Sequence, residues 1–332
     1  MMTVKPVIAF VTGGYSSESV ISYKSAITIA ANLDTDRFDV YKIDIRPEGW
    51  VYEYENGKVQ VDRDDFSILL TGKKIWFDAV FIGIHGTPGE DGKLQGYFDL
   101  HNIPYTSCDA ATSAITFNKR YTVAVASFAG IYTAKSLHLF ADSKLSANEI
   151  ASQLSFPVFV KPNNGGSSIG MSKVNDVKDL PDALDKAFRE DTQVLIEEFI
   201  SGREFTIGVY RNKEGIIVLP ITEVISGNDF FDYEAKYQGK SKEITPAQIP
   251  PETEEKIKTA ARNVFRIFNC RGVVRIDFIY NEQSDQPFLL EINTVPGQSE
   301  ASIIPQQVRA MGLTLKEFYS SLIDDALSRK HK

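Results

Sequence analysis

Two neighbouring apolar segments near the C-terminus carry the residues best suited to chemistry, GVVRIDFIY (272–280) and FLLEINTVPG (288–297). Because side chains two apart in a strand share a face, Arg275 and Asp277 point to one side of the first segment, and Glu291 and Asn293 to one side of the second. The polar turn between the segments favours a hairpin. One otherwise apolar sheet would then present a cation, two carboxylates and an amide oxygen at one spot.

Such a group of side chains suits a divalent cation. Burying these polar groups without partners would be costly, and oxygen ligands of this kind suit Mg²⁺, which keeps some of its waters and bridges to substrate phosphates. Asp277, Glu291 and Asn293 are therefore candidate metal ligands. The alternative is a solvated face with an ordinary surface ion pair, which would contribute little to stability.

A loop rich in glycine and serine follows a second strand-like run, in VKPNNGGSSIG (160–170), where Lys161 ends the apolar part. Backbone N–H groups in such a loop can approach phosphate oxygens closely, since glycine has no Cβ. It is not a Walker loop, because Met171 and Ser172 stand where Lys and Ser or Thr should follow Gly170. On these residues alone, a hairpin tip without a ligand explains the pattern equally well.

Three acidic residues, Glu197, Glu198 and Glu204, accompany the apolar run VLIEEFISGREF (194–205). As a purine site, this segment would read the base with backbone groups from Glu198 to Ile200 and place an acidic residue on the ribose. The segment alone favours the other interpretation, a charged edge strand that discourages aggregation.

Two loops near the N-terminus follow predicted strands, GGYSSES (13–19) and HGTPGEDG (85–92). Glu18 lies at the start of a helix, where its carboxylate could cap the helix or hold a substrate ammonium. His85 could be a satisfied core histidine or face a ligand. Lys119 opens a later helix, where it could pair with phosphate or simply be solvated.

The elements that must position these residues change in character along the chain. Up to residue 107, short apolar strands over 7–12, 39–45 and 78–84 alternate with helical segments such as 22–33. This alternation predicts an open, mostly parallel α/β sheet, in which ligands collect at the carboxyl ends of the strands.

The rest of the chain indicates antiparallel α+β structure. Its predicted elements include a hairpin over 157–174, strands over 204–210 and 216–224, and helices over 256–268 and 314–327. Thr314 and Glu317 match a capping box at the start of the last helix. The predicted fold class is α/β, and the expected domains are 1–107, 108–198 and 199–332.

Composition excludes several classes of protein. The 332 residues include 36 Lys and Arg against 44 Asp and Glu, so the net charge is −8, and general affinity for nucleic acid or acidic membranes is not expected. Cys108 and Cys270 lie outside any CxxC pattern and predict two buried free thiols. We find neither a signal-peptide core nor a membrane-spanning apolar run. We therefore expect a cytoplasmic protein.

Eight motifs occur in the order and approximate spacing of one family: GGYSSE, HGTPGEDGKLQG, FNK, VFVKPNNGGSSIGMSKV, VLIEEFISGREFT, DYEAKY, VVRIDF and LLEINTVPGQSEASIIP. In these motifs the chain resembles, nearly end to end, the D-alanine:D-alanine ligases, which are ATP-grasp carboxylate–amine ligases. The resemblance implies an N-terminal α/β domain followed by a two-part ATP-grasp α+β module.

The resemblance also implies an ADP-forming ligation that supplies peptidoglycan precursors. ATP would phosphorylate the carboxylate of one D-alanine, and the amine of a second would displace the phosphate. The residues implied to contact the nucleotide are Lys119, Lys161, Ser168, Glu197, Glu198, Ile200 and Glu204. Asp277, Glu291 and Asn293 would hold two Mg²⁺, for which Mn²⁺ could substitute.

The same resemblance implies the contacts of the two amino acids. Glu18 would bind the ammonium of the first D-alanine, with Ser167 and Tyr237 linked to it by hydrogen bonds. Ser302 would take the carboxylate of the second D-alanine, and His85 would lie beside the first.

Two further features of the reaction follow from the resemblance. Lys236 and Tyr237 would lie in a loop that covers the reaction and excludes water. Arg275 and the Gly297 N–H would stabilise the tetrahedral oxyanion.

The residues leave some choice of product. Relatives that make D-alanyl-D-lactate tend to lack a tyrosine at the position of Tyr237, so we predict the dipeptide. The alternatives are ligation to D-lactate or another D-amino acid, and a non-catalytic ATP-binding regulatory protein. The resemblance implies a homodimer. Ser19 and Val20 depart from the charged residues usual after the family's glutamate.

Overall fold

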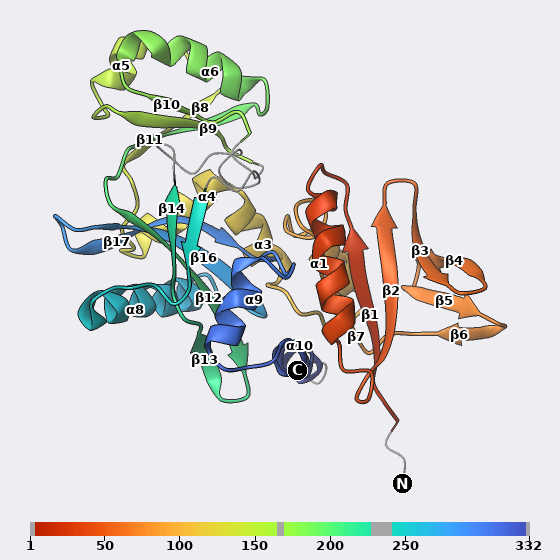
Figure 1. The fold of residues 1–332 in the computed structure, drawn as a ribbon. Helices are drawn as coiled ribbons and strands as arrows, with labels where there is room; N and C mark the ends of the chain where they lie inside the picture. The colour runs from red at the N-terminus through yellow and green to blue at the C-terminus, as the bar shows by residue number, and fades with distance from the viewer. Residues whose placement is uncertain (1–3, 165–168, 227–240, 330–332) are drawn as a thin grey trace.

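The computed structural model describes residues 4–164, 169–226 and 241–329, which form three β-sheets flanked by helices (Figure 1). In Figure 1 the N-terminal sheet lies at the right, a six-stranded sheet lies at the centre left, and a four-stranded sheet lies above it. Within these described ranges, no helix has the length and apolar character needed to cross a bilayer.

Seven strands form the first sheet, in the order β6-β5-β4-β3-β2-β1-β7. Their bounds are β1 Val7–Gly13, β2 Asp39–Arg46, β3 Gly49–Tyr54, β4 Gly57–Asp62, β5 Ser67–Leu70, β6 Lys73–Ile75 and β7 Ala79–Ile82. β1 pairs in parallel with β2 and β7, as predicted, whereas the pairs from β2 to β6 are antiparallel. The sheet is therefore mixed rather than mostly parallel, because residues 49–75 fold back through turns too short for a parallel crossover.

The parallel strands position the two N-terminal loops. α1 (Ser19–Asn32) follows β1, and α2 (Lys93–Leu100) follows β7. Since β1 and β7 are parallel neighbours, the loops after them emerge at the same edge of the sheet. A backbone hydrogen bond of 2.8 Å from Tyr15 N to Thr87 O joins the two loops.

Four strands form the second sheet, in the order β10-β9-β11-β8. Its elements are β8 Ser136–Phe140, α5 Ala147–Ala151, β9 Val158–Pro162, β10 Ser172–Val174, the 3₁₀ turn Val177–Asp179, α6 Leu180–Phe188 and β11 Gln193–Glu198. The antiparallel pairing of β9 with β10 confirms the hairpin predicted over 157–174. α5 and α6 pack their apolar residues on one face of this sheet (Figure 1).

Six strands form the third sheet, in which β15-β14-β12-β16-β17 is the main order and β13 pairs with β12. The bounds are β12 Arg203–Asn212, β13 Gly215–Val218, β14 Thr222–Ser226, β15 Ser241–Ile244, β16 Val273–Asn281 and β17 Gln286–Asn293. The single strand predicted over 216–224 is wrong, because Pro220 lacks an N–H for the ladder and divides the segment into β13 and β14.

Three helices cover the core of the third sheet, α3 (Ala110–Phe117), α4 (Lys119–Phe128) and α8 (Pro251–Ile267). The apolar spacing predicted over 256–268 is confirmed, since Ile257, Ala261, Val264 and Phe265 are all buried. Cys108 and Cys270 are buried free thiols in the same core, as expected.

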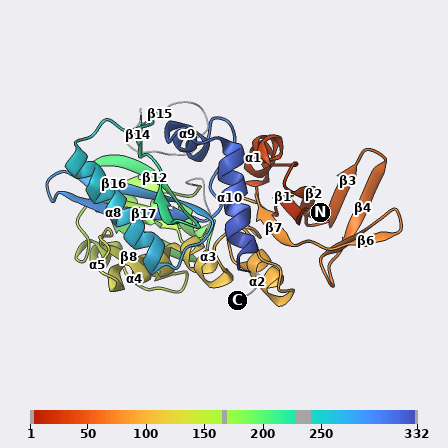
Figure 2. The ribbon, with the colours of Figure 1, turned by 90° about the horizontal axis from the view of Figure 1, so that it is seen from below.

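The C-terminal helix joins the first and third sheets into one core. α9 (Ile303–Ala310) and α10 (Leu315–Leu327) follow β17, and the predicted capping box of Thr314 and Glu317 is present. Figure 2 shows α10 running between β12 and the N-terminal strands. Its Phe318 packs edge-to-face on Tyr210 of β12, and Tyr319 does so on Phe81 of β7. The described N- and C-terminal parts are thus packed against each other through α10.

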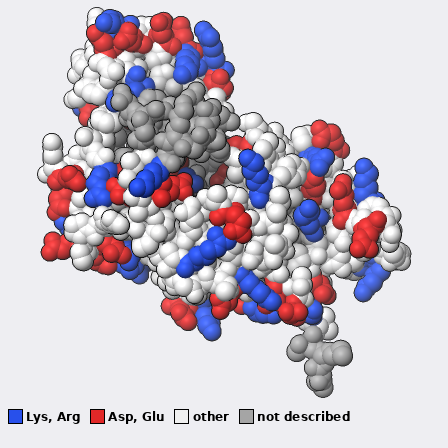
Figure 3. Space-filling model, in the orientation of Figure 1, with Lys and Arg blue, Asp and Glu red and all other residues white. Residues whose placement is uncertain are grey.

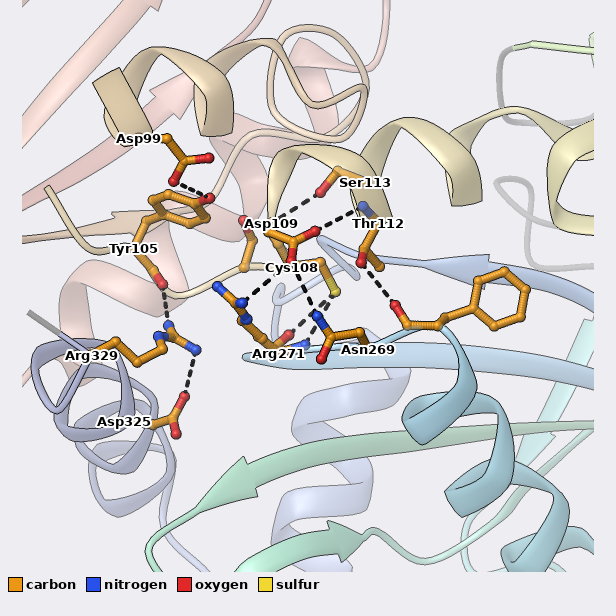
Figure 4. Close-up of polar contacts among 12 residues, drawn as sticks. Asp99, Tyr105, Cys108, Asp109, Thr112, Ser113, Asn269, Arg271, Asp325 and Arg329 are labelled. Atoms are coloured by element: carbon orange, nitrogen blue, oxygen red, sulfur yellow. Dashed lines mark hydrogen bonds and ion pairs between the residues drawn. The ribbon is translucent and has the colours of Figure 1, made fainter. Parts of the chain in front are cut away.

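Polar contacts lock the same junction (Figure 4). Arg329 donates a hydrogen bond of 2.5 Å to the Tyr105 carbonyl and pairs with Asp325 at 2.9 Å. Gly272 has a φ of +59°, and a Cβ there would lie 1.7 Å from Thr106 O. Only glycine therefore permits this approach of the two backbones.

Candidate active site

The hairpin of β16 and β17 brings the predicted metal ligands together. Asp277 lies opposite Glu291, and Arg275 lies opposite Asn293, in the antiparallel register. Arg275 donates from Nε to Asp277 Oδ1 at 2.9 Å and from Nη2 to Asp277 Oδ2 at 2.8 Å, and its Nη2 lies 3.3 Å from Glu291 Oε1. Because Asp277 is only 6% exposed, the alternative of a solvated face is wrong.

The charges of this cluster compensate one another inside the protein. Burial acts to lower the pKa of Arg275, but the attraction of Asp277, Glu291 and Glu90 outweighs it, so the pKa of this guanidinium is raised and the side chain stays charged. Asn293 Nδ2 lies 3.4 Å from both Asp277 Oδ2 and Glu291 Oε1. The three oxygen-bearing side chains therefore converge on one point.

The chemistry of this donor set fits Mg²⁺. Carboxylate and amide oxygens are hard ligands that this ion prefers, and a half-turn of the Asn293 amide would exchange its nitrogen for a third oxygen. Across the part of the chain that the structure describes, no group of three His, Cys, Asp or Glu side chains is arranged to hold a metal. The candidate is thus a set of two carboxylates and one amide.

A pocket of about 360 Å³ opens beside this cluster. Ten of the predicted site residues line it: Glu18, His85, Lys119, Glu204, Arg275, Asp277, Glu291, Asn293, Gly297 and Ser302. The first two belong to the loops at the carboxyl ends of β1 and β7, and the last six belong to β16, β17 and the segment after them. The pocket therefore lies where the loops of the first sheet meet the third sheet, as the sheet topology predicts.

Glu18 faces the pocket instead of capping α1. It occupies the N-cap position, but its side chain makes no capping hydrogen bond, so the capping alternative is wrong. Its carboxylate packs closely on Gly86, where a Cβ would lie 2.5 Å from Glu18 Oε2. Gly86 also has a φ of +67°, which glycine adopts without strain.

His85 is a buried imidazole at the edge of the pocket. Its backbone N–H donates to Ser22 Oγ at 2.9 Å, and its Nε2 lies 2.9 Å from Ser25 Oγ. Burial lowers the pKa of His85 to about 4, and a hydrogen bond with the Val295 backbone acts in the opposite direction. The side chain is therefore a satisfied histidine that also lines the pocket.

Gly297 and Ser302 lie side by side. A Cβ on Gly297 would lie 2.9 Å from Ser302 Oγ. Ser302 precedes α9 without capping it, and its hydroxyl lies 2.7 Å from Ser299 Oγ. The glycine leaves this hydroxyl beside the Gly297 backbone, within the lining of the pocket.

Lys161 and Glu197 form an ion pair on the second sheet, with side chains 15% and 10% exposed. β11, which carries Glu197, lies between β9 and β8, so the interpretation as a charged edge strand is wrong. Asn163 connects this sheet to α4, because Asn163 O accepts from Lys119 N at 3.2 Å and Asn163 Oδ1 accepts from Arg120 N at 2.8 Å. The helix that begins at Lys119 is thus fixed to the strand that carries Lys161.

The remaining residues that were predicted to contact the nucleotide lie in two places. Glu198 uses its carboxylate to accept a hydrogen bond from Ser155 N at 2.7 Å and its own N–H to donate to Lys135 O at 2.9 Å. Glu204 lies on β12 in the pocket lining. Four predicted residues lie outside the described residues: Ser167, Ser168, Lys236 and Tyr237.

Glu90 is a half-buried carboxylate of the pocket wall that was not predicted from the sequence. Its oxygens accept hydrogen bonds from Gly86 N at 2.7 Å and Val295 N at 3.2 Å. Burial raises the pKa of Glu90 to about 8, and the charge of Glu18 adds to this effect. The available signal was its place in the HGTPGEDG loop, where it follows a buried strand among small residues.

On the face seen in Figure 3, acidic and basic side chains are interspersed. Neither sign forms a broad uniform field among the coloured side chains of this view. The charged cluster of Arg275, Asp277 and Glu291 belongs instead to the pocket lining.

Comparisons with known proteins show which family this sequence matches. The family model described as D-ala D-ala ligase N-terminus matches residues 7–108, and that described as D-ala D-ala ligase C-terminus matches residues 117–324. A D-alanine–D-alanine ligase of Flavobacterium johnsoniae is 44% identical over 322 residues, which cover 97% of this chain and 99% of that protein.

Solved structures give the same result for the fold. The VanG D-Ala:D-Ser ligase of Enterococcus faecalis has a TM-score of 0.86 at 31% identity, with 96% of this chain and 99% of that chain covered. The D-alanine–D-alanine ligase of Bacillus anthracis in complex with ATP has a TM-score of 0.79 at 26% identity, with 98% and 99% covered. The described fold and the matched sequence together show that this chain belongs to the D-alanine–D-alanine ligase family.

Proposed function

We propose that this protein ligates two D-alanine molecules to D-alanyl-D-alanine with ATP, for peptidoglycan precursor synthesis. The γ-phosphoryl group moves to a carboxylate oxygen of the first D-alanine and leaves ADP. The amine of the second D-alanine, having lost a proton, attacks the acyl carbon, and the bond from that carbon to the phosphate-bearing oxygen breaks. One ATP and two D-alanines thus yield one dipeptide, ADP and phosphate.

The observation that carries this proposal is the meeting of Glu18, Arg275 and Gly297 in one pocket. A carboxylate can hold the ammonium of an amino acid, while a guanidinium and a backbone N–H can stabilise the oxyanion that forms at its carboxyl carbon. Glu18 comes from the N-terminal loops and the other two from the C-terminal hairpin and its following segment. Their arrangement supports a first D-alanine that spans the two parts of the pocket.

The second amino acid would lie beside the first. Ser302 would bind its carboxylate, since the hydroxyl borders Gly297. His85 would lie beside the first substrate, where it lines the pocket. Ser167, Tyr237 and Lys236 retain the roles implied by the family resemblance, which are hydrogen bonding to Glu18 and closure over the reaction.

The nucleotide would lie between the second and third sheets. Lys119 and Lys161 would hold phosphate oxygens, which requires Lys161 to exchange its partner Glu197 for the nucleotide. Glu204 and Glu197 would face the ribose and adenine, with backbone groups from Glu198 to Ile200 on the base. Ser168 would belong to the loop over the phosphates.

Asp277, Glu291 and Asn293 would hold two Mg²⁺, with Mn²⁺ as a substitute. When bound, these ions neutralise charge on the phosphate groups. Arg275 then serves two functions: it keeps the carboxylates in place through the hydrogen bonds described above, and it presents positive charge to the developing oxyanion.

A second candidate function changes only the second substrate. The VanG relative is a D-Ala:D-Ser ligase, so the architecture accommodates more than one acceptor, and D-lactate is a further alternative. A sequence identity of 44% to a D-alanine–D-alanine ligase, over 97% of the chain, favours D-alanine. Competition between D-alanine and D-lactate from pH 6 to 9 distinguishes them. An ammonium must lose a proton before it can attack, whereas the hydroxyl of a hydroxy acid is neutral and already has a free lone pair.

We further propose a homodimer, a cytoplasmic location and three domains at 1–107, 108–198 and 199–332. The homodimer rests on the family resemblance and is tested by sedimentation velocity. The cytoplasmic location is supported by the need for ATP and by the two free buried thiols. The domain division is supported by the three separate sheets. α10 belongs to the last domain in sequence but packs on the first sheet.

The test of the function is a product analysis. The purified protein, incubated with ATP, Mg²⁺ and D-alanine, should release phosphate and form a compound with the mass of the dipeptide. Lys161→Ala and Asp277→Ala should abolish both products. Binding of ATP without turnover of any D-amino acid would contradict the proposal and favour a non-catalytic regulatory protein.

A further inference from the structure

The hydroxyl of Ser25 joins parts of the pocket wall that are far apart in the sequence. Ser25 lies on α1 and is fully buried. Its Oγ lies 2.9 Å from His85 Nε2 and accepts a hydrogen bond from Gln298 N at 3.1 Å. One oxygen atom therefore connects α1, the loop after β7 and the segment after β17.

The hydrogen bonds of Ser25 indicate which ring nitrogen of His85 carries the proton. The Gln298 N–H can only donate, and His85 Nε2 lies within hydrogen-bond distance of the same hydroxyl, so we assign the Ser25 proton to the bond with His85 Nε2. Nε2 is then an acceptor, and the imidazole carries its proton on Nδ1. Burial lowers the pKa of His85 to about 4. A hydrogen bond with the Val295 backbone acts in the opposite direction, as expected when the ring donates to a carbonyl oxygen. His85 is thus a neutral imidazole held between Ser25 and Val295.

Both ends of this hydrogen-bond chain hold the same short turn. Val295 and Gln298 lie on either side of Pro296 and Gly297. The turn has another attachment on its first side, where Glu90 accepts from Val295 N at 3.2 Å. On its second side, Ser25 is the acceptor for Gln298 N. The chain of contacts thus holds the backbone on both sides of the Gly297 N–H.

We infer that Ser25 and His85 are positioning residues, which hold the Val295–Gln298 turn so that the Gly297 N–H faces the carbon under attack. This inference rests on the proposed function, because it requires an oxyanion beside Gly297. Ser25 is absent from the pocket lining, so its effect on the reaction passes through His85 and the turn. A misplacement of about 1 Å in such a site can lower the rate about 100-fold.

The test compares Ser25→Ala with Ser113→Ala. Ser113 is a matched control, because it is also a fully buried helical serine, and its hydroxyl donates to Cys108 O at 3.4 Å, away from the pocket lining. We expect Ser25→Ala to lower kcat about 10- to 100-fold while the Kd for ATP stays close to that of wild type. Ser113→Ala should change neither quantity. A Ser25→Ala variant that retains wild-type kcat would overturn the inference.

A second measurement does not depend on turnover. In ¹⁵N-histidine spectra of the wild-type protein at pH 7, the ring of His85, identified by its loss in His85→Gln, should be neutral and protonated on Nδ1. A ring protonated on Nε2, or a charged ring, would overturn the inference even if Ser25→Ala fails to fold. Absence of dipeptide formation by the wild-type protein would instead contradict the proposed function, so the two failures are distinguishable.

Discussion

Asp277 faces Glu291 across β16 and β17, and the guanidinium of Arg275 lies within hydrogen-bond distance of both carboxylates. Two neighbouring carboxylates on adjacent strands repel each other unless cations compensate them. One such cation belongs to the chain itself. The remaining negative charge lines the pocket, where divalent cations would compensate it.

Removal of one carboxylate should therefore weaken the use of metal. Divalent ions supply several kcal/mol of charge stabilisation, and 1.36 kcal/mol corresponds to a tenfold change in rate. We expect Asp277→Asn to lower kcat about 100-fold or more and to raise the Mg²⁺ concentration for half-maximal rate, measured by phosphate release. Asp285→Asn is the control, since Asp285 lies in the turn of the same hairpin and its side chain is 60% exposed. Equal Mg²⁺ dependence in both variants would contradict this assignment.

A methyl group at position 86 should displace the carboxylate of Glu18. The Cβ of Gly86→Ala would meet Glu18 Oε2 at 2.5 Å. A charge-assisted hydrogen bond contributes about 1.5–3 kcal/mol, so we expect KM for D-alanine to rise about 10-fold or more while KM for ATP is unchanged. Gly72→Ala is matched for backbone strain, because Gly72 also has a positive φ but open space around it. The idea fails if Gly86→Ala changes KM for ATP and not KM for D-alanine.

The buried neutral His85 should make the protein less stable in acid. Its folded pKa of about 4 lies below the ordinary value of 6.5, so the unfolded chain binds the proton more readily. This contribution to the free energy of unfolding is present above pH 6.5 and is lost as the pH falls toward 4, by up to about 3 kcal/mol. Urea unfolding at several pH values should show a smaller loss for His85→Gln. An identical pH dependence in the two proteins would contradict the assignment.

The close approach at Gly272 should make this position sensitive to any side chain. Gly272→Ala would place a Cβ 1.7 Å from Thr106 O at a φ of +59°, and such overpacking with backbone strain costs about 2–4 kcal/mol. Thermal unfolding should therefore show a lower Tm. Gly312→Ala tests the strain alone, because Gly312 has a φ of +83° and nothing within 4 Å of the added Cβ. Equal losses of Tm in both variants would exclude a role for the contact.

The hairpin of β16 and β17, which carries the candidate metal ligands, could be predicted because its pattern is local. Alternation of apolar and polar residues fixes which side chains share a face, and a short polar turn between two strands makes their pairing the simplest outcome. Asp277 and Glu291 therefore lie where the alternation places them. The loops after β1 and β7 were predictable for a related reason, because parallel neighbours end at the same edge of a sheet.

Features that depend on distant contacts could not be predicted. The position of β11 inside its sheet, which removes the edge-strand interpretation of Glu197, is decided by pairing with β8 and β9. Ser25 looks like any small helical residue, and only the approach of His85 and Gln298 gives its hydroxyl partners. The antiparallel extension over 49–75 consists of short strands whose order the local pattern does not specify.

The most direct test of the central claim follows the oxygen atoms of the substrate. D-alanine labelled with ¹⁸O in both carboxylate positions is incubated with the enzyme, ATP and Mg²⁺, and the products are analysed by mass spectrometry. Ligation through an acyl phosphate transfers one ¹⁸O to each released phosphate and leaves three in the dipeptide. Released phosphate without ¹⁸O would contradict the account, because the carboxylate would then never have been joined to phosphorus.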